Sequence, residues 1–225
     1  MNIHTVMQNL REKRAVFHSE HDFKFALAWE IQLQYSEAKI RLEYPHRLVY
    51  PHPGERDGFF DIFVDLDGHR YIIELKYMRA TIEVKYNGEI FKLKYPDENQ
   101  NYRDSFYRDI LRIEEATRCR SIKCGYAILL TNYQPYWDRY PESNGYKGNK
   151  INWNKYPSFS VCEGTIITGH NEWHESANDL RKRGPVVFNG EYPVKWQKYS
   201  EIQIQNCISP SYNRSFMYAL VSVLA

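Results

Sequence analysis

Asp61, Glu74 and Lys76 are the residues of this chain whose types and spacing are best suited to chemistry. Two carboxylates held side by side repel each other, and a divalent cation between them removes that repulsion. Mg²⁺ in proteins is typically held by one or two carboxylates together with phosphate oxygens of a substrate. A lysine beside such a site supplies a positive charge for a phosphate or for a developing negative nucleophile. The three residues therefore predict a divalent-metal site that takes a phosphate-bearing ligand.

A β-hairpin over residues 59–78 would bring these three side chains onto one face. Two runs rich in aromatic and β-branched residues flank Asp67-Gly68, and both turn residues tolerate the positive φ of a type I′ turn. A two-residue turn fixes the register, so that positions whose numbers sum to 135 face each other. Asp61 then faces Glu74, and Lys76 lies two residues further along the face of Glu74.

The alternative is that Asp61, Glu74 and Lys76 are three surface charges on an exposed sheet face, with one isolated salt bridge. A sequence selected for stability alone would not place two carboxylates opposite each other. The rest of that face is apolar, which favours the metal site over the surface-charge interpretation; its residues are Phe59, Phe63, Ile72 and Met78.

Length and composition indicate one globular domain. The chain has 225 residues, 43% hydrophobic and 26% charged, which are ordinary values for a single folded unit. The net charge of +2 excludes a global basic field, so nucleic acid would have to be bound by local patches. No apolar run is long enough to cross a membrane and no signal peptide is recognisable, so we expect no membrane partner and a cytoplasmic location.

A third carboxylate belongs to a predicted helix near the N-terminus. Ser19 begins a capping pattern, and the helix that follows is expected to run to about residue 36. Glu20 projects onto the same side as its apolar stripe, which is formed by Phe23, Leu27 and Ile31. A carboxylate on the core-facing side of a helix needs a partner or a metal. The alternative is that Glu20 only favours the helix N-terminus electrostatically.

The remaining elements are expected as follows: a basic helix over 10–17, a strand over 40–50, a hairpin around Asn87-Gly88, a helix over 102–118 and a strand buried on both faces over 124–131. Residues 133–156 form an aromatic and basic loop, which would either stack bases or pack on its own rings. Two or more strands are expected over 186–208 and a closing strand or helix over 215–224.

This order of elements, with Asp61 on one strand and Glu74-Leu75-Lys76 on the next, resembles the PD-(D/E)XK (restriction-endonuclease-like) nuclease superfamily. Residues 17–30 and 41–44 look like a group of uncharacterised bacterial proteins in it, as do residues 88–93 and 107–114. The resemblance implies an α/β fold whose core has a mixed central sheet flanked by helices, in the order αβββαβ. It covers residues 10–131 of a single nuclease-like domain, 1–225, and leaves a β-rich C-terminal extension of unknown role over 132–225.

The resemblance implies a metal-dependent nuclease that hydrolyses phosphodiester bonds of nucleic acid, with DNA as the expected substrate and Mg²⁺ or Mn²⁺ as cofactor. The implied metal ligands are Asp61, Glu74, the Leu75 carbonyl and Glu20, which would complete the shell or bind a second ion. Lys76 would orient or help to deprotonate the attacking water, or stabilise the transition state, and so joins Asp61, Glu74 and Glu20 in the catalytic set. Nucleic-acid contacts are assigned to Tyr107, Arg108 and Arg112, and a homodimer is compatible with this reading.

Two other functions remain open on the sequence alone. A nuclease-like fold that binds nucleic acid or protein without cutting is favoured by the low net charge and the Tyr- and Trp-rich C-terminal half. The other is a small regulatory or interaction protein in which the hairpin is only structural. Replacing Asp61 by asparagine would then be neutral or stabilising, since it relieves the repulsion between Asp61 and Glu74. His170 and His174 have the i, i+4 spacing of a zinc site but lack the HExxH pattern, and the four cysteines are too sparse for a disulfide framework.

Overall fold

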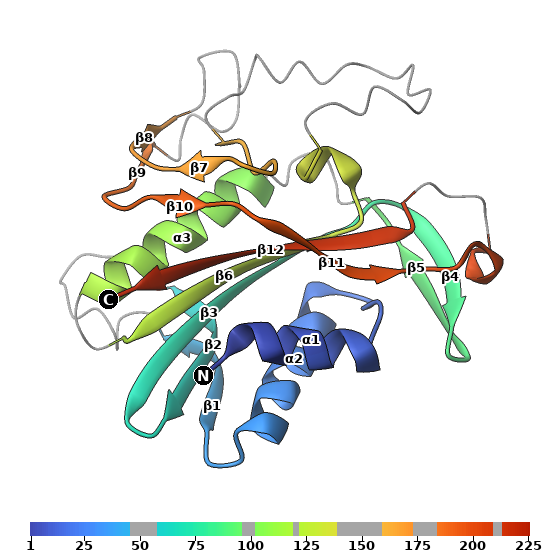
Figure 1. Cartoon of the computed structure of the whole chain (residues 1–225), viewed down its shortest axis with the longest axis horizontal. Coiled ribbons are helices and arrows are strands. Elements are labelled where there is room, and N and C mark those ends of the chain that lie inside the picture. The colour runs from blue at the N-terminus through green and yellow to red at the C-terminus, as the bar shows by residue number, and fades with distance from the viewer. Residues whose placement is uncertain (46–57, 96–101, 119–121, 139–158, 173–183, 209–212) are drawn as a thin grey trace.

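The computed structural model describes residues 1–45, 58–95, 102–118, 122–138, 159–172, 184–208 and 213–225. The fold is mixed α/β, as expected, with a six-stranded mixed sheet and three α-helices in the described part of the chain (Figure 1). The helices are α1 (Ile3–Lys13), α2 (Glu20–Gln34) and α3 (Tyr102–Arg118). In spatial order the strands are β1 (Lys39–Pro45), β2 (Phe59–Leu66), β3 (His69–Met78), β6 (Cys124–Thr131), β12 (Ser215–Leu224) and β11 (Trp196–Glu201).

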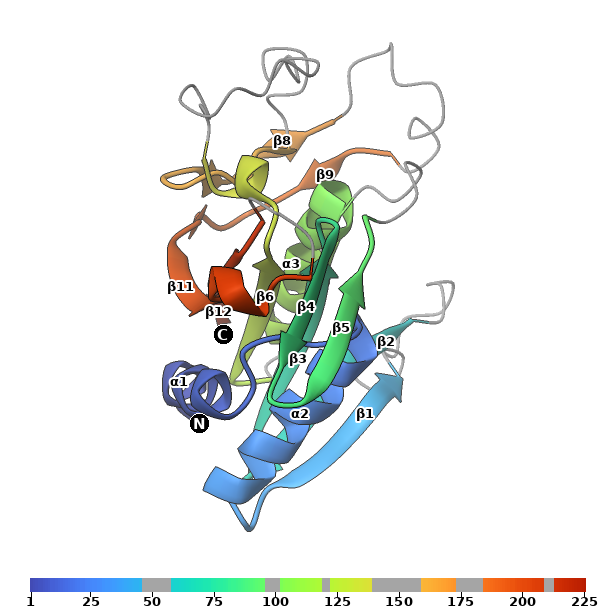
Figure 2. The same ribbon diagram turned by 90° about the vertical axis from the view of Figure 1, so that its right-hand side faces the viewer.

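Strands β1, β2 and β3 form an antiparallel meander, and β3 then pairs with β6 in parallel. A parallel pair needs a crossover connection, which here contains α3. The helices cover opposite faces of the sheet: α1 and α2 pack with one apolar cluster and α3 with the other. In Figure 2, α2 runs beside β1 at the edge of the sheet, and Lys24 of α2 contacts Glu43 of β1.

Both predicted hairpins are confirmed. Strands β2 and β3 pair from Leu66 opposite His69 to Ile62 opposite Ile73, in the predicted register. The turn residues Asp67 and Gly68 have φ values of 52° and 74°. Strands β4 (Ile82–Tyr86) and β5 (Glu89–Leu93) pair around Asn87-Gly88, where φ is also positive. A type I′ turn requires positive φ at both positions, which is why these dipeptides locate the turns correctly.

The N-terminal helices agree only in part with the sequence analysis. Helix α2 begins as predicted, with the Ser19 side chain accepting a hydrogen bond from the Asp22 backbone N–H. The helix predicted over 10–17 is wrong, because α1 occupies Ile3–Lys13 and its C-cap is Arg14. The apolar stripe that holds α1 lies earlier in the chain than the basic run on which the prediction relied; its buried residues are Ile3, Val6, Met7 and Leu10.

The C-terminal part of the chain adds two strands to the central sheet, so this sheet is not confined to residues 10–131. Strand β12 pairs antiparallel with β6 along all eight β6 residues, and β11 pairs with β12. Strand β6 is buried on both faces and needs a neighbour on the edge that β3 leaves free, which the apolar β12 supplies. The segment before it is β-rich, as expected: β7 (Ile166–Ile167) pairs with β10 (Tyr192–Pro193), and β8 (His170–Asn171) with β9 (Val186–Val187).

A buried glutamate attaches this C-terminal segment to α3. Glu114, 4% exposed, accepts hydrogen bonds at its Oε1 from the Asn189 and Gly190 backbone N–H groups, at 2.9 and 2.7 Å, and from the Tyr192 hydroxyl at 2.8 Å. Burial alone raises the pKa of Glu114, but the hydrogen bonds from Tyr192, Gly190 and Asn189 outweigh it and hold the pKa below its ordinary value of 4.5. The ionised carboxylate therefore stabilises the fold.

We expect Glu114→Gln to lower the free energy of unfolding by about 2 kcal/mol at pH 7, because hydrogen bonds to a charged acceptor are replaced by bonds to a neutral amide. The pKa of Glu114 is lowered on folding, so its stabilisation is present above pH 4.5 and is lost as the pH falls through the folded value. Urea unfolding of both proteins at pH 7 and at pH 3 measures this. A deficit that stays constant between the two pH values would contradict the assignment.

No helix in the described ranges is both long and apolar enough to span a membrane.

Candidate active site

Asp61 and Glu74 lie on neighbouring strands at the point where their regular pairing ends. The last paired residues are Ile62 and Ile73, so the predicted Asp61–Glu74 pair lies one step beyond the ladder. The Asp61 carboxylate instead accepts a hydrogen bond from the Leu75 backbone N–H, at 2.8 Å from Oδ2. The side chain thus binds the backbone of the Glu-x-Lys segment and fixes Asp61 beside it.

Helix α3 supplies two further charged residues to this site. Arg112 places Nε and Nη2 at 3.0 and 2.8 Å from Glu74 Oε1, and its Nη2 lies 2.5 Å from Asp109 Oδ1. The other oxygen of Asp109, Oδ2, lies 2.7 Å from Lys76 Nζ. The result is an alternating chain of charges, Lys76–Asp109–Arg112–Glu74, that joins both functional side chains of β3 to the helix.

Asp109 was not predicted from the sequence, although a signal was present. Asp109 is 2% exposed and lies three residues after Phe106 and four before Ile113, both fully buried. A carboxylate on the apolar stripe of a helix needs a partner, by the argument that singled out Glu20. The same search on α3 would have found Asp109.

Helix α2 contributes to the opposite side of Asp61. Lys24, whose side chain is 8% exposed, lies with Nζ 3.0 Å from Asp61 Oδ1 and also contacts the Glu43 carboxylate. Glu20 accepts a hydrogen bond at Oε2 from the Tyr77 backbone N–H, at 2.7 Å. Asp61 and Glu20 thus accept hydrogen bonds from the β3 backbone on either side of Lys76, at Leu75 and Tyr77. Helix α2 positions both carboxylates, because Lys24 contacts Asp61 and Glu20 belongs to the first turn of the helix.

The site holds more negative than positive charge. If every group is ionised, five carboxylates face three cations, which gives this group of described residues a formal charge of −2; the residues are Glu20, Glu43, Asp61, Glu74, Asp109, Lys24, Lys76 and Arg112. Burial, reinforced by the charge of Asp109, raises the pKa of Glu74 well above its ordinary value. Burial also raises the pKa values of Glu20 and Asp109. A bound divalent cation would balance the excess.

Lys76 is held as an ammonium ion. Burial alone lowers the pKa of a lysine, but the carboxylates of Asp109, Glu20 and Glu74 outweigh it and raise the pKa of Lys76 above its ordinary value. An ammonium group carries no lone pair with which to accept a proton. Of the roles considered for Lys76, the surroundings therefore favour charge stabilisation over proton abstraction.

The donor set fits a small, hard divalent cation. Carboxylate and carbonyl oxygens are the ligands of Mg²⁺, which is often held by only one or two carboxylates and keeps waters. Asp61 and Glu74 provide these carboxylates. The Leu75 carbonyl, which accepts a hydrogen bond from Lys76 Nζ at 3.2 Å, lies between Glu74 and Lys76 in sequence. Within the described residues no three acidic, histidine or cysteine side chains are grouped as metal ligands. That Glu20 completes the shell or binds a second ion stays a prediction.

The predicted nucleic-acid contacts on α3 are engaged with protein. Tyr107 is 2% exposed and its hydroxyl donates to the Ser160 carbonyl at 2.7 Å, so its assignment as a nucleic-acid contact is wrong. Arg108 donates to the Asp104 carboxylate and, at 2.7 Å, to the Gly184 carbonyl. Arg112 is occupied by Glu74 and Asp109. The reason is that the segment after residue 159 packs across α3, a long-range contact that helical periodicity does not reveal.

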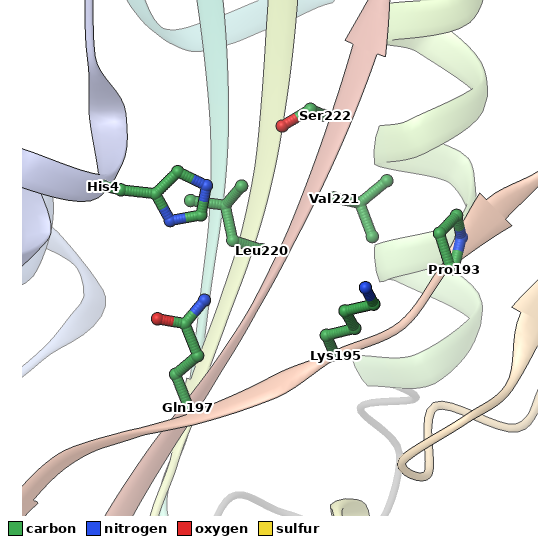
Figure 3. A pocket seen from close by; sticks show the side chains of 7 residues that line it. All are labelled: His4, Pro193, Lys195, Gln197, Leu220, Val221 and Ser222. Carbon is green, nitrogen blue, oxygen red and sulfur yellow. The ribbon is translucent and has the colours of Figure 1, made fainter.

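The alternative metal motifs lie partly outside the described residues. His170 lies in strand β8 with Nε2 3.2 Å from Glu172 Oε2, and His174 lies outside the described residues. Cys124, Cys162 and Cys207 are free thiols, and Cys119 lies outside the described residues. A hollow of about 220 Å³ lies between the first turn of α1 and residues of β10, β11 and β12 (Figure 3). Its lining residues are His4, Pro193, Lys195, Gln197, Leu220, Val221 and Ser222.

Comparison with protein-family models, with curated proteins and with solved structures finds no match to this chain. The case for a function therefore rests on the residues and geometry described above.

The ion pair between Arg112 and Glu74 predicts a pH-dependent stability. We expect Arg112→Gln to lower the free energy of unfolding by about 3 kcal/mol at pH 8. This value is at the low end for breaking a buried ion pair, because the Arg112 side chain is 36% exposed and solvent screens the interaction. The pKa values of Glu74 and Asp109 are raised, so ionising these groups costs stability as the pH rises through those values, and Arg112 offsets that cost. The deficit should therefore shrink at pH 5.

Urea unfolding of the parent and of Arg112→Gln at both pH values measures this effect. Arg41→Gln is the matched control. Arg41 is exposed, and among the described residues its guanidinium donates a hydrogen bond to the carbonyl of the neighbouring Ile40. A deficit of equal size at pH 5 and pH 8 would show that Arg112 does not compensate buried carboxylates.

Proposed function

We propose that this chain is a metal-dependent nuclease of the PD-(D/E)XK (restriction-endonuclease-like) type, which hydrolyses phosphodiester bonds in nucleic acid, with DNA as the expected substrate. One observation carries the proposal. Asp61, Glu74 and the Lys76 ammonium lie together where β2 and β3 stop pairing, in a cluster whose formal charge is −2 when every group is ionised. A divalent cation would balance that excess, and such an ion can catalyse phosphodiester hydrolysis.

Asp61 and Glu74 would hold Mg²⁺ or Mn²⁺, with the Leu75 carbonyl as a backbone ligand. When bound, the ion supplies a water of lowered pKa and neutralises phosphate charge. The remaining steps depend on side chains of the protein. Lys76, kept protonated by its carboxylate neighbours, stabilises negative charge that develops on the phosphate. Its ammonium is directed by Asp109 at 2.7 Å.

The remaining carboxylate and the second lysine serve as positioning residues. Glu20 fixes the end of β3 through its hydrogen bond from the Tyr77 N–H and adds negative charge near Lys76. Lys24 holds the Asp61 carboxylate from the α2 side at 3.0 Å. This arrangement supports a site whose two metal-binding carboxylates are aimed by separate helices, Asp61 by α2 and Glu74 by α3.

A second candidate function is a nuclease-like module that binds nucleic acid or protein without cutting it. The observation in its favour is that each candidate metal ligand already has a cationic side chain, Lys24 on Asp61 and Arg112 on Glu74. In such a module these pairs are permanent. In a nuclease they are the resting arrangement, and a metal ion with a phosphate displaces at least one of them.

The two functions separate in a cleavage panel. Supercoiled plasmid, linear duplex, single-stranded DNA and single-stranded RNA are each incubated with the protein in Mg²⁺, in Mn²⁺ and in EDTA. The proposal predicts metal-dependent cleavage of at least one DNA substrate. Cleavage of RNA alone would move the substrate class to RNA. Binding of these nucleic acids without cleavage in either metal would overturn the nuclease in favour of the binding module.

A further inference from the structure

Lys24 is a buried lysine shared between two carboxylates, where helix α2 runs beside the edge of the sheet. Its side chain is 8% exposed, and its ammonium lies 3.0 Å from Asp61 Oδ1 and also contacts the Glu43 carboxylate. Glu43 belongs to the edge strand β1, and its side chain is 54% exposed. A buried ammonium needs anionic partners, because burying an unpaired charge is costly. Lys24 therefore has one partner inside the candidate site and a second partner next to solvent.

The backbone of Glu43 departs from a regular strand conformation. Strands β1 and β2 pair on both sides of this position, in a register in which Glu43 would face Asp61. Glu43 has instead a φ of 50°, a left-handed conformation that is uncommon for residues other than glycine, asparagine and aspartate. Such strain persists only where the surrounding structure imposes it, and it is found most often at functional sites. Here it accompanies the contact between Glu43 and Lys24.

We infer that Glu43 is the residue that keeps Lys24 paired when a divalent cation occupies the candidate site. This role depends on the proposed metal site and deepens it. In the metal-free protein Lys24 neutralises Asp61, but a divalent cation bound to Asp61 would repel the Lys24 ammonium. Lys24 then relies on Glu43 as its anionic partner. Glu43 thus acts as a positioning residue that lowers the cost of metal binding, because without it a buried ammonium would lose its compensation.

Arg112, which neutralises the other candidate metal ligand, is held more firmly than Lys24. Its guanidinium donates two hydrogen bonds to Glu74 Oε1 and a third to Asp109, whose other oxygen already pairs with a lysine. Glu43, in contrast, contacts only Lys24 among the described ion pairs. An ammonium on a flexible four-carbon stem also changes partner more readily than a planar guanidinium. Lys24 is therefore the cation that gives way.

Isothermal titration calorimetry with Mn²⁺, in the absence of nucleic acid, tests this role. Glu43→Gln is expected to weaken Mn²⁺ binding by at least about 10-fold, the usual effect of a residue that supports a metal ligand. Glu37→Gln is the matched control, because it removes an exposed carboxylate from the turn before β1, and it should leave the affinity unchanged.

Lys24→Met gives the opposite expected sign. It removes the charge but keeps the apolar stem, and Asp61 stays fixed by its hydrogen bond from the Leu75 N–H. We expect it to tighten Mn²⁺ binding by at least about 5-fold, because the ion no longer meets a like charge. Weaker binding by Lys24→Met would show that Lys24 only supports the structure around Asp61, and would overturn the inference.

The double variant Lys24→Met/Glu43→Gln separates this role from direct metal binding by Glu43. If Glu43 acts through Lys24, the double variant binds Mn²⁺ within about 2-fold of Lys24→Met, the effect of one screened surface charge. A further loss of about 10-fold in the Lys24→Met background would make Glu43 a metal ligand and overturn the inference. Circular dichroism checks that each variant is folded. Because Glu43 is half-exposed, Glu43→Gln keeps the test decisive even if Lys24→Met does not fold.

Failure of this role is distinguishable from failure of the proposed function. A parent that binds Mn²⁺, with unchanged affinity in Glu43→Gln, would overturn the role of Glu43 and leave the metal site in place. A parent without measurable affinity for Mn²⁺ would overturn the metal site, and the role of Glu43 with it.

Discussion

Lys76→Ala is expected to reduce metal-dependent cleavage by about 10²–10³-fold, the loss typical when one group that stabilises charge in the transition state is removed. The physical reason is the protonation state of Lys76. Its Nζ lies 2.7 Å from Asp109 Oδ2 and the neighbouring carboxylates keep it charged, so in the proposed nuclease the side chain would provide a fixed positive charge at the reacting phosphate. Initial rates of plasmid nicking in Mg²⁺ measure the effect.

Two companion variants make the result specific. Lys76→Arg keeps a positive charge and should retain more activity than Lys76→Ala, whereas a lysine that acted as a base would lose as much in either variant. Lys92→Ala removes an exposed lysine of β5. Among the described ion pairs Lys92 contacts only Glu83, so this variant should cut at the parental rate. Equal cleavage by the parent and Lys76→Ala would remove Lys76 from the site.

Asp61→Asn is expected to weaken Mn²⁺ binding by at least about 10²-fold, because a neutral amide is a poor ligand for a hard divalent cation and one of two carboxylates is lost. Isothermal titration calorimetry of the parent and the variant measures this without any substrate. Asp65→Asn is the matched control on the same strand, since the Asp65 carboxylate is partly exposed and lies 3.9 Å from Arg70. Unchanged Mn²⁺ affinity in Asp61→Asn would show that the metal binds elsewhere.

The stability of Asp61→Asn does not separate the competing functions, contrary to the expectation from sequence. That expectation treated Asp61 and Glu74 as an unrelieved pair of like charges, which asparagine would relieve. In the structure Asp61 is paired with Lys24 and accepts the Leu75 N–H, so the amide loses an ion pair in either case. Metal affinity, rather than unfolding, is therefore the informative quantity.

The parts of the fold that depend on short-range chemistry were predictable from the sequence. Asp67-Gly68 and Asn87-Gly88 located both hairpin turns because few residues adopt positive φ, and Ser19 located the start of α2 because its hydroxyl satisfies a free backbone N–H. The register that follows from the first turn placed Asp61 and the Glu-x-Lys residues together. It failed only at the last pair, where Asp61 turns to the Leu75 backbone.

The parts that depend on contacts between distant segments were not predictable in this way. Lys24 and Asp109 reach the site from two helices on opposite faces of the sheet, and no spacing within one element pairs them with β2 or β3. Tyr107 was assigned to nucleic acid because the cover over α3 comes from residues more than 50 positions later. Strand β12 enters the central sheet for the same reason, since strand order follows from tertiary packing.

The most direct test of the central claim is the nicking of supercoiled plasmid in one reaction that is started with Mg²⁺, stopped with EDTA and restarted with excess Mg²⁺. A metal-dependent nuclease predicts that nicked and linear DNA accumulate, stop accumulating when the ion is removed, and accumulate again when it returns. Intact plasmid at every stage, with Mn²⁺ as well as Mg²⁺, or cutting that continues in EDTA, would contradict the claim.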